Sequence, residues 1–310
     1  MKSGELLREV EGRIRGPALA ETPLARHTTY GIGGPAEVLA CPRDVGEAER
    51  LLAWAGEAGV PTHLLGRGSN LLVADSGVRG LVLKTRSGLG DLRRPDGCDV
   101  PTVEVEAGLA LSSLLGYCLS RGLRGLEYLA GIPGTVGGAV AMNAGVYDCT
   151  IGALVHGVRA FDFQSRRAVD LTRAECGFAY RRSIFLEDGG PAVLAARLTL
   201  SAGDPETIAE IMRARVRFRQ NNHPWRMPSA GSVFRNPDGI SAGRLIEAAG
   251  MKGRRVGGAQ VSALHGNFIV NVGGATSRDI LALIEEVRRA VSARFGVDLE
   301  LELRTWGEDA

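Results

Sequence analysis

The chain has 310 residues, of which 45% are hydrophobic and 23% charged, and its formal net charge is +2. This composition is typical of a folded protein of two or three domains, and it argues against nucleic acid or a membrane surface as the main partner. The five cysteines form no C-x-x-C pair and are odd in number, which argues against a metal site and a disulfide framework. Residues 1–16 lack the apolar core of a signal peptide and no stretch is apolar enough to span a bilayer, so we expect a cytoplasmic protein.

The first part of the chain predicts a small α/β unit. Asp44 is placed to cap a helix that carries apolar residues at helical spacing and ends at Gly59. Short strands are expected at 60–65, 71–73 and 81–84. The glycine-rich turn Gly66–Asn70 joins the first two strands, and the polar segment 88–97 indicates a boundary with the next unit.

The middle of the chain predicts a mostly β unit with one main helix. The expected helix is 111–120, and the expected strands are 103–107, 155–163, 168–171 and 192–201. The segment 131–145 contains five glycines and no charged residue. Bare backbone amides can cradle an anion such as a pyrophosphate, so this loop predicts phosphate binding through amides and Thr135. A glycine-rich packing turn is the alternative interpretation.

The last part of the chain predicts an α+β unit. Asp204-Pro205 is typical of a helix start, Thr276 with Asp279 indicates another, and a shorter helix is expected at 241–249. A strand is expected at 267–272. Residues 297–303 alternate strictly between apolar and charged side chains, which predicts a terminal strand with Glu302 on its polar face.

Several short motifs follow one another in a familiar order. They are His27–Ala36, Gly66–Asn70, Gly131–Gly145, Tyr180–Ser183, Ala230–Pro237 and Glu302–Arg304. Each is weak alone, but in this order over nearly the whole chain they resemble the MurB family, the UDP-N-acetylenolpyruvoylglucosamine reductases. A helix follows Asn236 closely, which resembles the family's shorter form, lacking an inserted loop that carries a substrate-binding tyrosine.

The resemblance implies an α+β fold with a two-part FAD-binding domain of the vanillyl-alcohol-oxidase/PCMH type and a C-terminal α+β substrate-binding domain. The expected domains are 1–86, 87–203 and 204–310, with the terminal strand returning towards the flavin. The implied cofactor is non-covalent FAD, with NADPH as co-substrate. The implied substrate is a UDP-linked enolpyruvyl amino sugar, reduced to a lactyl ether in peptidoglycan precursor synthesis, and no oligomer is required.

The resemblance also implies binding residues. Those for the cofactor lie in or beside the glycine-rich loops and are Gly66, Gly68, Ser69, Asn70, Gly108, Gly131, Ile132, Gly134, Thr135, Gly137, Gly138, Asn143 and Gly145. Those for the substrate are Tyr180, Arg235, Asn236, His265 and Arg304. A buried structural histidine is an equal alternative for His265.

Three further residues are implied to be catalytic. Hydride addition to the enolpyruvyl group places negative charge on C2 and its carboxylate, so the reaction needs a stabilising cation and a proton donor. Arg181 suits the first task because a guanidinium can fork onto a carboxylate, and Ser232 is implied for the second. Glu302 is implied to polarise the carboxylate, with its pKa raised by burial. From the residues alone, an ion-paired arginine, a turn serine and a solvated strand glutamate such as Glu300 are the alternatives.

Some positions depart from the family's pattern. Asn222 and Leu264 stand where the family often has lysine, and Trp306 replaces an aliphatic residue. The residues that hold the UDP phosphates therefore stay open, among them the arginines of the 204–220 helix. Two other functions are considered: a different FAD oxidoreductase of the same fold, and a non-catalytic nucleotide-binding homologue. A Rossmann site at 31–34 is excluded because a strand, not a helix, is expected to follow it.

Overall fold

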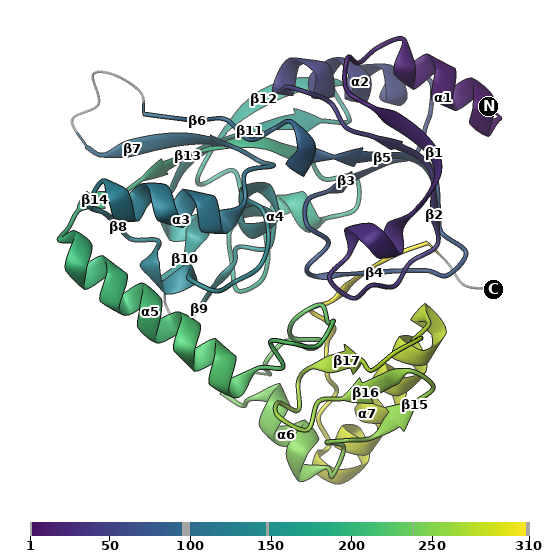
Figure 1. Ribbon diagram of the computed structural model, residues 1–310, viewed down its shortest axis with the longest axis vertical. Helices are drawn as coiled ribbons and strands as arrows, with labels where there is room; N and C mark the ends of the chain where they lie inside the picture. Colours follow the sequence, from purple (N-terminus) through teal and green to yellow (C-terminus); the bar gives the residue numbers. More distant parts are fainter. Residues whose placement is uncertain (1, 95–99, 147–148, 238, 308–310) are drawn as a thin grey trace. The chain divides into compact units, whose positions relative to one another are not determined.

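The computed structural model describes residues 2–94, 100–146, 149–237 and 239–307 (Figure 1). The chain folds into two compact units. Unit 1 is Met1–Ala20, Val38–Arg67 and Gly80–Arg217, and unit 2 is Glu21–Glu37, Gly68–Arg79 and Phe218–Ala310. The predicted boundaries at 86 and 203 divide the chain into consecutive domains, whereas each of these units combines several chain segments, so the predicted domains stay predictions. The predicted boundary segment 88–97 is described only as far as Arg94.

A four-stranded sheet has the order β1-β2-β5-β3, and the chain passes from one unit to the other within β1, β2 and β5. The strands are β1 (Ala18–Pro23), β2 (Pro35–Ala40), β5 (Val78–Lys84) and β3 (Thr62–Leu65). Helix α2 (Val45–Glu57) begins as predicted, because the Asp44 side chain accepts the Glu47 N–H at 2.8 Å. Its buried residues pack with α1 (Ser3–Glu11) and β5 in one of the cores of unit 1.

The second sheet of unit 1 is antiparallel and has the order β12-β11-β13-β7-β6. Its strands are β12 (Arg167–Thr172), β11 (Val155–Asp162), β13 (Ala192–Thr199), β7 (Thr102–Glu106) and β6 (Leu92–Arg93). Val103 and Val105 of β7 share a core with α3 (Leu111–Ser120) and α4 (Val136–Ala141), whereas Glu104 between them points to the opposite face. Short pairs β9 (Gly145–Val146) with β10 (Cys149–Thr150), and β8 (Leu123–Arg124) with β14 (Ser201–Ala202), complete the unit.

Unit 2 has its own core, formed mainly by α6 (Ala242–Ala248), α7 (Ser277–Phe295) and the sheet β15-β16-β17 (Figure 1). The strands are β15 (Arg255–Val256), β16 (Ala259–Val261) and β17 (Ile269–Asn271). Thr276 and Asp279 form the predicted capping box of α7. Helix α5 (Pro205–Asn222) crosses the boundary between the units in sequence, and Asp204 caps it by accepting the Thr207 N–H at 2.8 Å.

Two expected elements differ from the structure. The terminal strand is not 297–303: only Leu301 makes an isolated bridge there, to Phe234, and strand β18 (Arg304–Trp306) pairs with β4 (Leu71–Val73). Burial still follows the alternation in part, since Leu299 and Leu303 are buried while Asp298 and Glu300 are exposed, but Leu301 and Glu302 are both half-buried. The loop 131–145 contains helix α4, which forms despite two glycines because Thr135 caps it and its apolar residues are buried.

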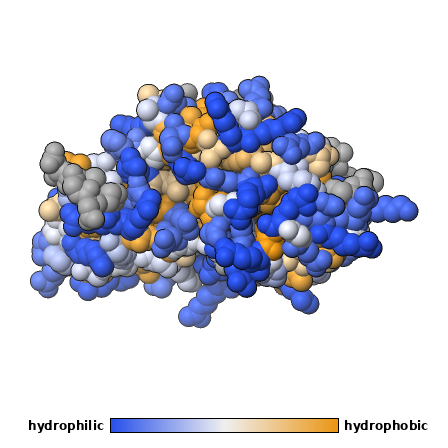
Figure 2. Space-filling model, turned by 90° about the horizontal axis from the view of Figure 1, so that it is seen from above, coloured by the Kyte–Doolittle hydropathy of each residue, from blue (hydrophilic) through white to orange (hydrophobic). Residues whose placement is uncertain are grey.

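One face of the molecule is mostly hydrophilic, with apolar residues in small areas between the charged ones (Figure 2). Among the described helices, none is both long and apolar enough to cross a membrane.

Candidate functional site

The glycine-rich loop of unit 1 is built around the short helix α4. Thr135 caps its start through a hydrogen bond that its hydroxyl accepts from Gly138 N–H at 3.4 Å. Its end is a Schellman motif, in which Ala144 N–H donates to Ala139 O and Asn143 N–H to Val140 O. Asn143 takes the left-handed position of this motif with φ 43°, a conformation that asparagine tolerates better than most residues.

The loop packs tightly against the segment that follows β7. Gly137 N–H donates to Ala107 O at 2.8 Å and Val136 N–H to Leu109 O at 2.9 Å. A Cβ on Gly108 would collide with the carbonyl oxygens of Thr85 and Leu89. Within the loop itself, the packing-turn interpretation is correct for Gly137 and Gly145, where an added Cβ would collide with Ala107 or with the carbonyl oxygen of Cys149.

The remaining surface of the loop fits a dinucleotide cofactor. Pro133 and Gly138 are exposed and Gly134 is half-buried, so an uncharged rim of backbone is accessible. A Cβ on Gly138 would meet only Thr135 Oγ1, at an ordinary 3.6 Å, so the space beside this glycine is open. Uncharged, glycine-rich backbone at a helix start is the donor set that suits a pyrophosphate.

The Tyr180-Arg181 turn is fixed to this loop by side chains. Asn143 donates from Nδ2 to Ala179 O at 2.8 Å, and its Oδ1 accepts Gly152 N–H at 3.0 Å. Ser183 is fully buried and donates from its hydroxyl to Ala141 O at 2.6 Å. The turn itself is closed by paired hydrogen bonds between Ala179 and Arg182.

Arg181 occupies the third position of this turn with φ 53°. Glycine or asparagine is the usual residue in that conformation, so an arginine here is held in a strained backbone. Its guanidinium donates to Gly145 O at 2.9 Å and lies 5.3 Å from the ring centre of Tyr180, which is 53% exposed. The structure thus presents the Arg181 charge beside the glycine-rich loop and next to an exposed aromatic ring.

In unit 2 the serine loop, residues 229–237 around Ser232, runs beside the C-terminal segment, residues 297–306. Val233 O accepts Glu302 N–H at 2.8 Å, and Arg235 N–H donates to Glu300 O at 2.8 Å. Asn70 contacts the same C-terminal segment, because its Nδ2 donates to Glu302 O and its carbonyl accepts Arg304 N–H. Backbone pairing therefore brings the half-buried Ser232 close to Glu302 and to the turn that contains Asn70.

A buried asparagine also supports the serine loop. Asn267 is 4% exposed, and its side chain donates to Phe234 O at 2.8 Å and accepts Phe234 N–H at 2.9 Å. Its own backbone accepts Val233 N–H at 2.9 Å. The amide therefore takes the place of a missing strand partner and fixes the two residues that follow Ser232.

The expected substrate residues of unit 2 have contacts within the fold. Asn236 Oδ1 accepts Ala242 N–H at 3.0 Å at the start of α6, and Arg235 pairs with Glu300 at 3.6 Å. His265 Nδ1 accepts Asn267 N–H at 3.1 Å. These contacts orient the side chains, and their substrate roles stay predictions. The short path from Asn236 to α6 agrees with a form that has no loop inserted there.

The predicted site residues thus form a group within each unit. In unit 1 these are Gly66, Gly108, Gly131 to Gly145, Tyr180 and Arg181, and in unit 2 these are Gly68, Ser69, Asn70, Ser232, Glu302 and Arg304. Sequence reasoning missed the structural roles of Asn143 and Ser183. The signal was present for Asn143, because an asparagine just after an apolar helical turn is a common helix C-terminus.

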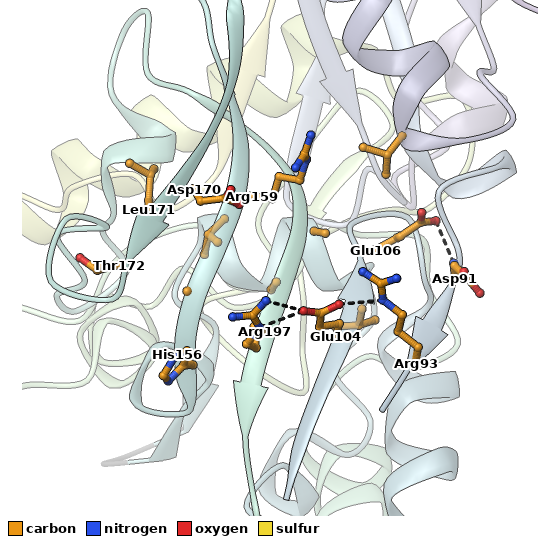
Figure 3. Close-up of a pocket in the computed structure, with 16 residues that line it drawn as sticks. Asp91, Arg93, Glu104, Glu106, His156, Arg159, Asp170, Leu171, Thr172 and Arg197 are labelled. Carbon is orange, nitrogen blue, oxygen red and sulfur yellow. Dashed lines mark hydrogen bonds and ion pairs between the residues drawn. The ribbon is translucent and has the colours of Figure 1, made fainter. Parts of the chain in front are cut away.

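A separate cavity of about 650 Å³ lies on the face of the five-stranded sheet of unit 1 that carries Glu104 and Arg197. Figure 3 shows Glu104 between Arg93 and Arg197, with hydrogen-bond distances of 2.7 and 2.5 Å. Burial alone would raise the pKa of Glu104, but these two arginines lower it. The third arginine of the cavity, Arg159, pairs with Glu49. Because its arginines are paired with glutamates and none of the predicted site residues lines it, we assign it no ligand.

Comparison with known proteins defines the class. Residues 36–166 match the FAD binding domain family, and residues 223–306 match the C-terminal domain of UDP-N-acetylenolpyruvoylglucosamine reductase. Together with the accessible glycine-rich rim, these matches define an FAD-dependent oxidoreductase that combines a flavin domain with a C-terminal domain. The fold class and the FAD cofactor predicted from the sequence are confirmed.

Full-length relatives identify the family. UDP-N-acetylenolpyruvoylglucosamine reductase from Moorella thermoacetica is 45% identical over 97% of both chains, and the one from Bacillus subtilis is 39% identical over 98% of both. The crystal structure of the Thermus caldophilus reductase (MurB) aligns with a TM-score of 0.76 and 36% identity, covering 95% of this chain and all of the other. The chain belongs to the UDP-N-acetylenolpyruvoylglucosamine reductase family.

Proposed function

We propose that the protein reduces UDP-N-acetylglucosamine enolpyruvate to UDP-N-acetylmuramate with NADPH, in cytoplasmic peptidoglycan precursor synthesis. The observation that carries the proposal is the 45% identity to a reductase of this name over 97% of both chains. The reactive residues expected from the resemblance are also present in this chain. FAD, once bound and reduced by NADPH, would supply the hydride that saturates the enolpyruvyl double bond.

Arg181 is proposed to bind the enolpyruvyl carboxylate. A carboxylate that gains charge during the reaction is stabilised most by a cation that is already oriented, because no reorganisation is then needed. The bond from Arg181 to Gly145 O and the strained turn both support such an orientation. The guanidinium has five N–H donors, so the bond to Gly145 leaves donors to form a fork with a carboxylate.

Ser232 is proposed to deliver the proton to C2, and Glu302 to polarise the carboxylate. A serine hydroxyl is a weak acid and needs a polar neighbour to act as a proton donor. The pairing of Val233 with Glu302 supports this assignment, because it places these two side chains on adjacent segments of backbone. Neither role requires a second copy of the chain.

Anaerobic spectroscopy of the FAD-loaded protein tests the proposal. NADPH should bleach the flavin absorbance, and the UDP-linked enolpyruvyl sugar should restore it. Bleaching without recovery would retain an FAD oxidoreductase but exclude this substrate. Failure to take up FAD would favour a non-catalytic homologue.

Glu302→Gln tests the assignment of the second carboxylate. We expect it to slow flavin reoxidation by the sugar at least tenfold more than Glu300→Gln does. Glu300 is a matched control because it lies two residues away, is exposed, and pairs with Arg235. Equal effects of the two variants would refute the role of Glu302.

A further inference from the structure

Both backbone groups of Glu302 are held in place, and they are held by two different segments of unit 2. Its N–H donates to Val233 O in the serine loop at 2.8 Å, and its carbonyl oxygen accepts a hydrogen bond from Asn70 Nδ2 at 3.0 Å. The next residue, Leu303, is 4% exposed and also donates its N–H to Val233 O, at 3.2 Å. The backbone of Glu302 is therefore fixed by main chain on the side of the serine loop and by the Asn70 side chain on the other.

The bond from the Asn70 side chain continues a short parallel ladder. Strand β18 pairs with β4 with Arg304 opposite Leu71, and Arg304 N–H donates to Asn70 O at 3.1 Å. One step further back, a continued parallel ladder would place a main-chain N–H of Asn70 against Glu302 O. The Asn70 side chain reaches this carbonyl oxygen, while Glu302 N–H has turned to the serine loop. The amide thus extends the ladder beyond the residues that pair as strands.

Only a hydrogen-bond donor suits the position of the Asn70 amide. The group that it faces, Glu302 O, is a carbonyl oxygen and can only accept. A carboxylate of the same shape would place one acceptor against another, and an apolar side chain would leave the carbonyl without this bond. The contact on this side of Glu302 therefore depends on which residue occupies position 70. The main-chain bonds on the other side can be made by almost any residue.

Asn70 ends the turn Gly66–Asn70, whose residues are expected to contact the cofactor. This turn is anchored in unit 2 by its backbone, because Thr29 N–H donates to Gly68 O at 3.1 Å and the Thr29 hydroxyl donates to the same oxygen at 3.3 Å. Asn70 connects the anchored turn to the backbone of Glu302. The position of Glu302 relative to the expected cofactor turn is therefore set by one side-chain amide and one main-chain bond, from Arg304.

We propose that Asn70 is a positioning residue, whose side-chain amide holds Glu302 at the correct distance from the turn that binds the cofactor. This inference rests on the proposed function for the role of Glu302 in the reaction. Asn70 acts through the backbone of Glu302 and not on the substrate. A reacting group that is misplaced by about 1 Å loses about 10²-fold in rate, so a small shift of this segment is sufficient to affect the reaction.

Two variants of Asn70 test this inference in the FAD-loaded protein. Asn70→Asp and Asn70→Leu both remove the donor and keep the approximate size of the side chain. Each should slow flavin reoxidation by the enolpyruvyl sugar about 10- to 100-fold, with reduction by NADPH within about twofold of the wild-type rate. Stopped-flow absorbance measures both half-reactions. Asn70→Leu adds no charge, so slowing that is confined to Asn70→Asp would be an electrostatic effect and would overturn the inference.

Asn271→Asp is the matched control in the same unit. Asn271 is half-buried, and its Nδ2 donates to Tyr30 O at 3.1 Å. Its Oδ1 accepts the N–H groups of Gly273 and Ala275, which an aspartate would still accept. The control therefore loses the same kind of amide-to-carbonyl bond, and none of these residues is a predicted site residue. Both half-reactions should keep their wild-type rates.

A double-mutant cycle with Glu302→Ala separates positioning from a general loss of structure. Glu302→Ala leaves no carboxyl group to position, so the addition of Asn70→Leu should slow reoxidation by less than about a further twofold. A structural role elsewhere would slow the double variant by the same factor as the single Asn70→Leu variant. Equal factors would therefore overturn the inference.

Amide hydrogen exchange provides a measurement that does not depend on the reaction. In Asn70→Leu, exchange at residues 302–304 should be about tenfold faster than in the wild type, whereas Asn271→Asp should leave it unchanged. If exchange rises but the enolpyruvyl sugar fails to reoxidise the wild-type flavin, the anchoring of Glu302 by Asn70 stands and the proposed reaction is wrong. If the sugar reoxidises the flavin at the wild-type rate in both Asn70 variants, the reaction stands and the role of Asn70 is wrong. Unchanged exchange in Asn70→Leu would also overturn this role.

Discussion

Each unit supports its predicted reactive loop with one buried asparagine, but the two asparagines work differently. Asn143 of unit 1 has a left-handed backbone and its side chain links Gly152 to Ala179. The side chain of Asn267 in unit 2 forms hydrogen bonds with both the N–H and the carbonyl oxygen of Phe234. The position of the strained Arg181 turn thus depends on hydrogen bonds from specific side chains. The position of the Ser232 loop depends mainly on backbone pairing, which many sequences could provide.

This difference predicts which substitutions change the stability of the protein and which change only the rate of the reaction. Near Arg181, the groups that hold the loop are specific side chains, so changes there should lower stability and cofactor binding together. Near Ser232, the loop is held by backbone pairing and by the side chain of Asn267. A change of the serine itself should therefore alter chemistry alone.

The largest expected effect is that of Ser232→Ala on flavin reoxidation. Loss of a proton donor should slow this half-reaction by about 10² to 10⁴-fold, while reduction by NADPH stays unchanged. Stopped-flow absorbance measures the two half-reactions separately. Ser229→Ala, three residues earlier in the same loop, is the control and should leave both rates unchanged. Equal slowing of both half-reactions by Ser232→Ala would show that the serine acts structurally.

The second prediction tests the strained asparagine of unit 1. Asn143→Ala removes two buried hydrogen bonds and places a Cβ-bearing residue without local polar support in the left-handed region, so we expect a loss of about 3 kcal/mol of unfolding free energy. Asn143→Gly loses the same bonds without the strain and should be about 1 kcal/mol more stable than the alanine variant. Urea unfolding monitored by circular dichroism measures both.

The amount of FAD that these two variants bind tests whether Asn143 supports the glycine-rich loop. Both should retain less FAD than the wild type, because Asn143 closes α4 and positions the glycine-rich loop. Equal stability of the alanine and glycine variants would mean that the left-handed conformation stores no strain. Normal FAD content in both would contradict the dependence of this loop on Asn143.

The third prediction concerns a buried carboxylate of unit 1. Glu47 is fully buried; burial alone would raise its pKa, but hydrogen bonds from Arg43 N–H and from Arg15 lower it from 4.5 to about 2. A lowered pKa in the folded state gives stability that is complete above the unfolded value and lost as the pH falls towards the folded one. The wild type should therefore lose more unfolding free energy than Glu47→Gln between about pH 5 and pH 2.5, measured by urea titration. Parallel losses would show that other carboxylates dominate acid unfolding.

Local signals in the sequence were sufficient for much of this fold. Asp44 before α2 and the Thr276–Asp279 pair before α7 are caps made by adjacent residues, so they can be recognised without knowing the tertiary structure. The terminal segment shows the limit. Its alternation correctly indicated that Leu299 and Leu303 are buried, but the strand formed at 304–306, because β4 is distant in sequence and determines where pairing occurs.

The candidate site was predictable only in part for the same reason. The glycine content of 131–145 indicated close backbone approach, and the structure shows that some of those glycines make room for the protein's own carbonyl groups. Nothing local distinguishes Glu302 from Glu300, or Arg181 from its neighbour Arg182, and only the family resemblance selected them.

The smallest expected effect comes from Tyr30 in the core of unit 2. Its side chain is fully buried, and its hydroxyl has no hydrogen-bond partner among the described residues. An unpaired buried hydroxyl costs free energy, since in the unfolded chain it bonds to water. Tyr30→Phe should therefore raise the unfolding free energy by about 1 kcal/mol, measured by urea unfolding. The hydroxyl of Ser183 in unit 1 offers the opposite case, because it donates to Ala141 O at 2.6 Å and its removal in Ser183→Ala should destabilise the protein. If Tyr30→Phe is also destabilising, the hydroxyl binds an internal water, and the core of unit 2 relies on a polar anchor just as the Arg181 turn does.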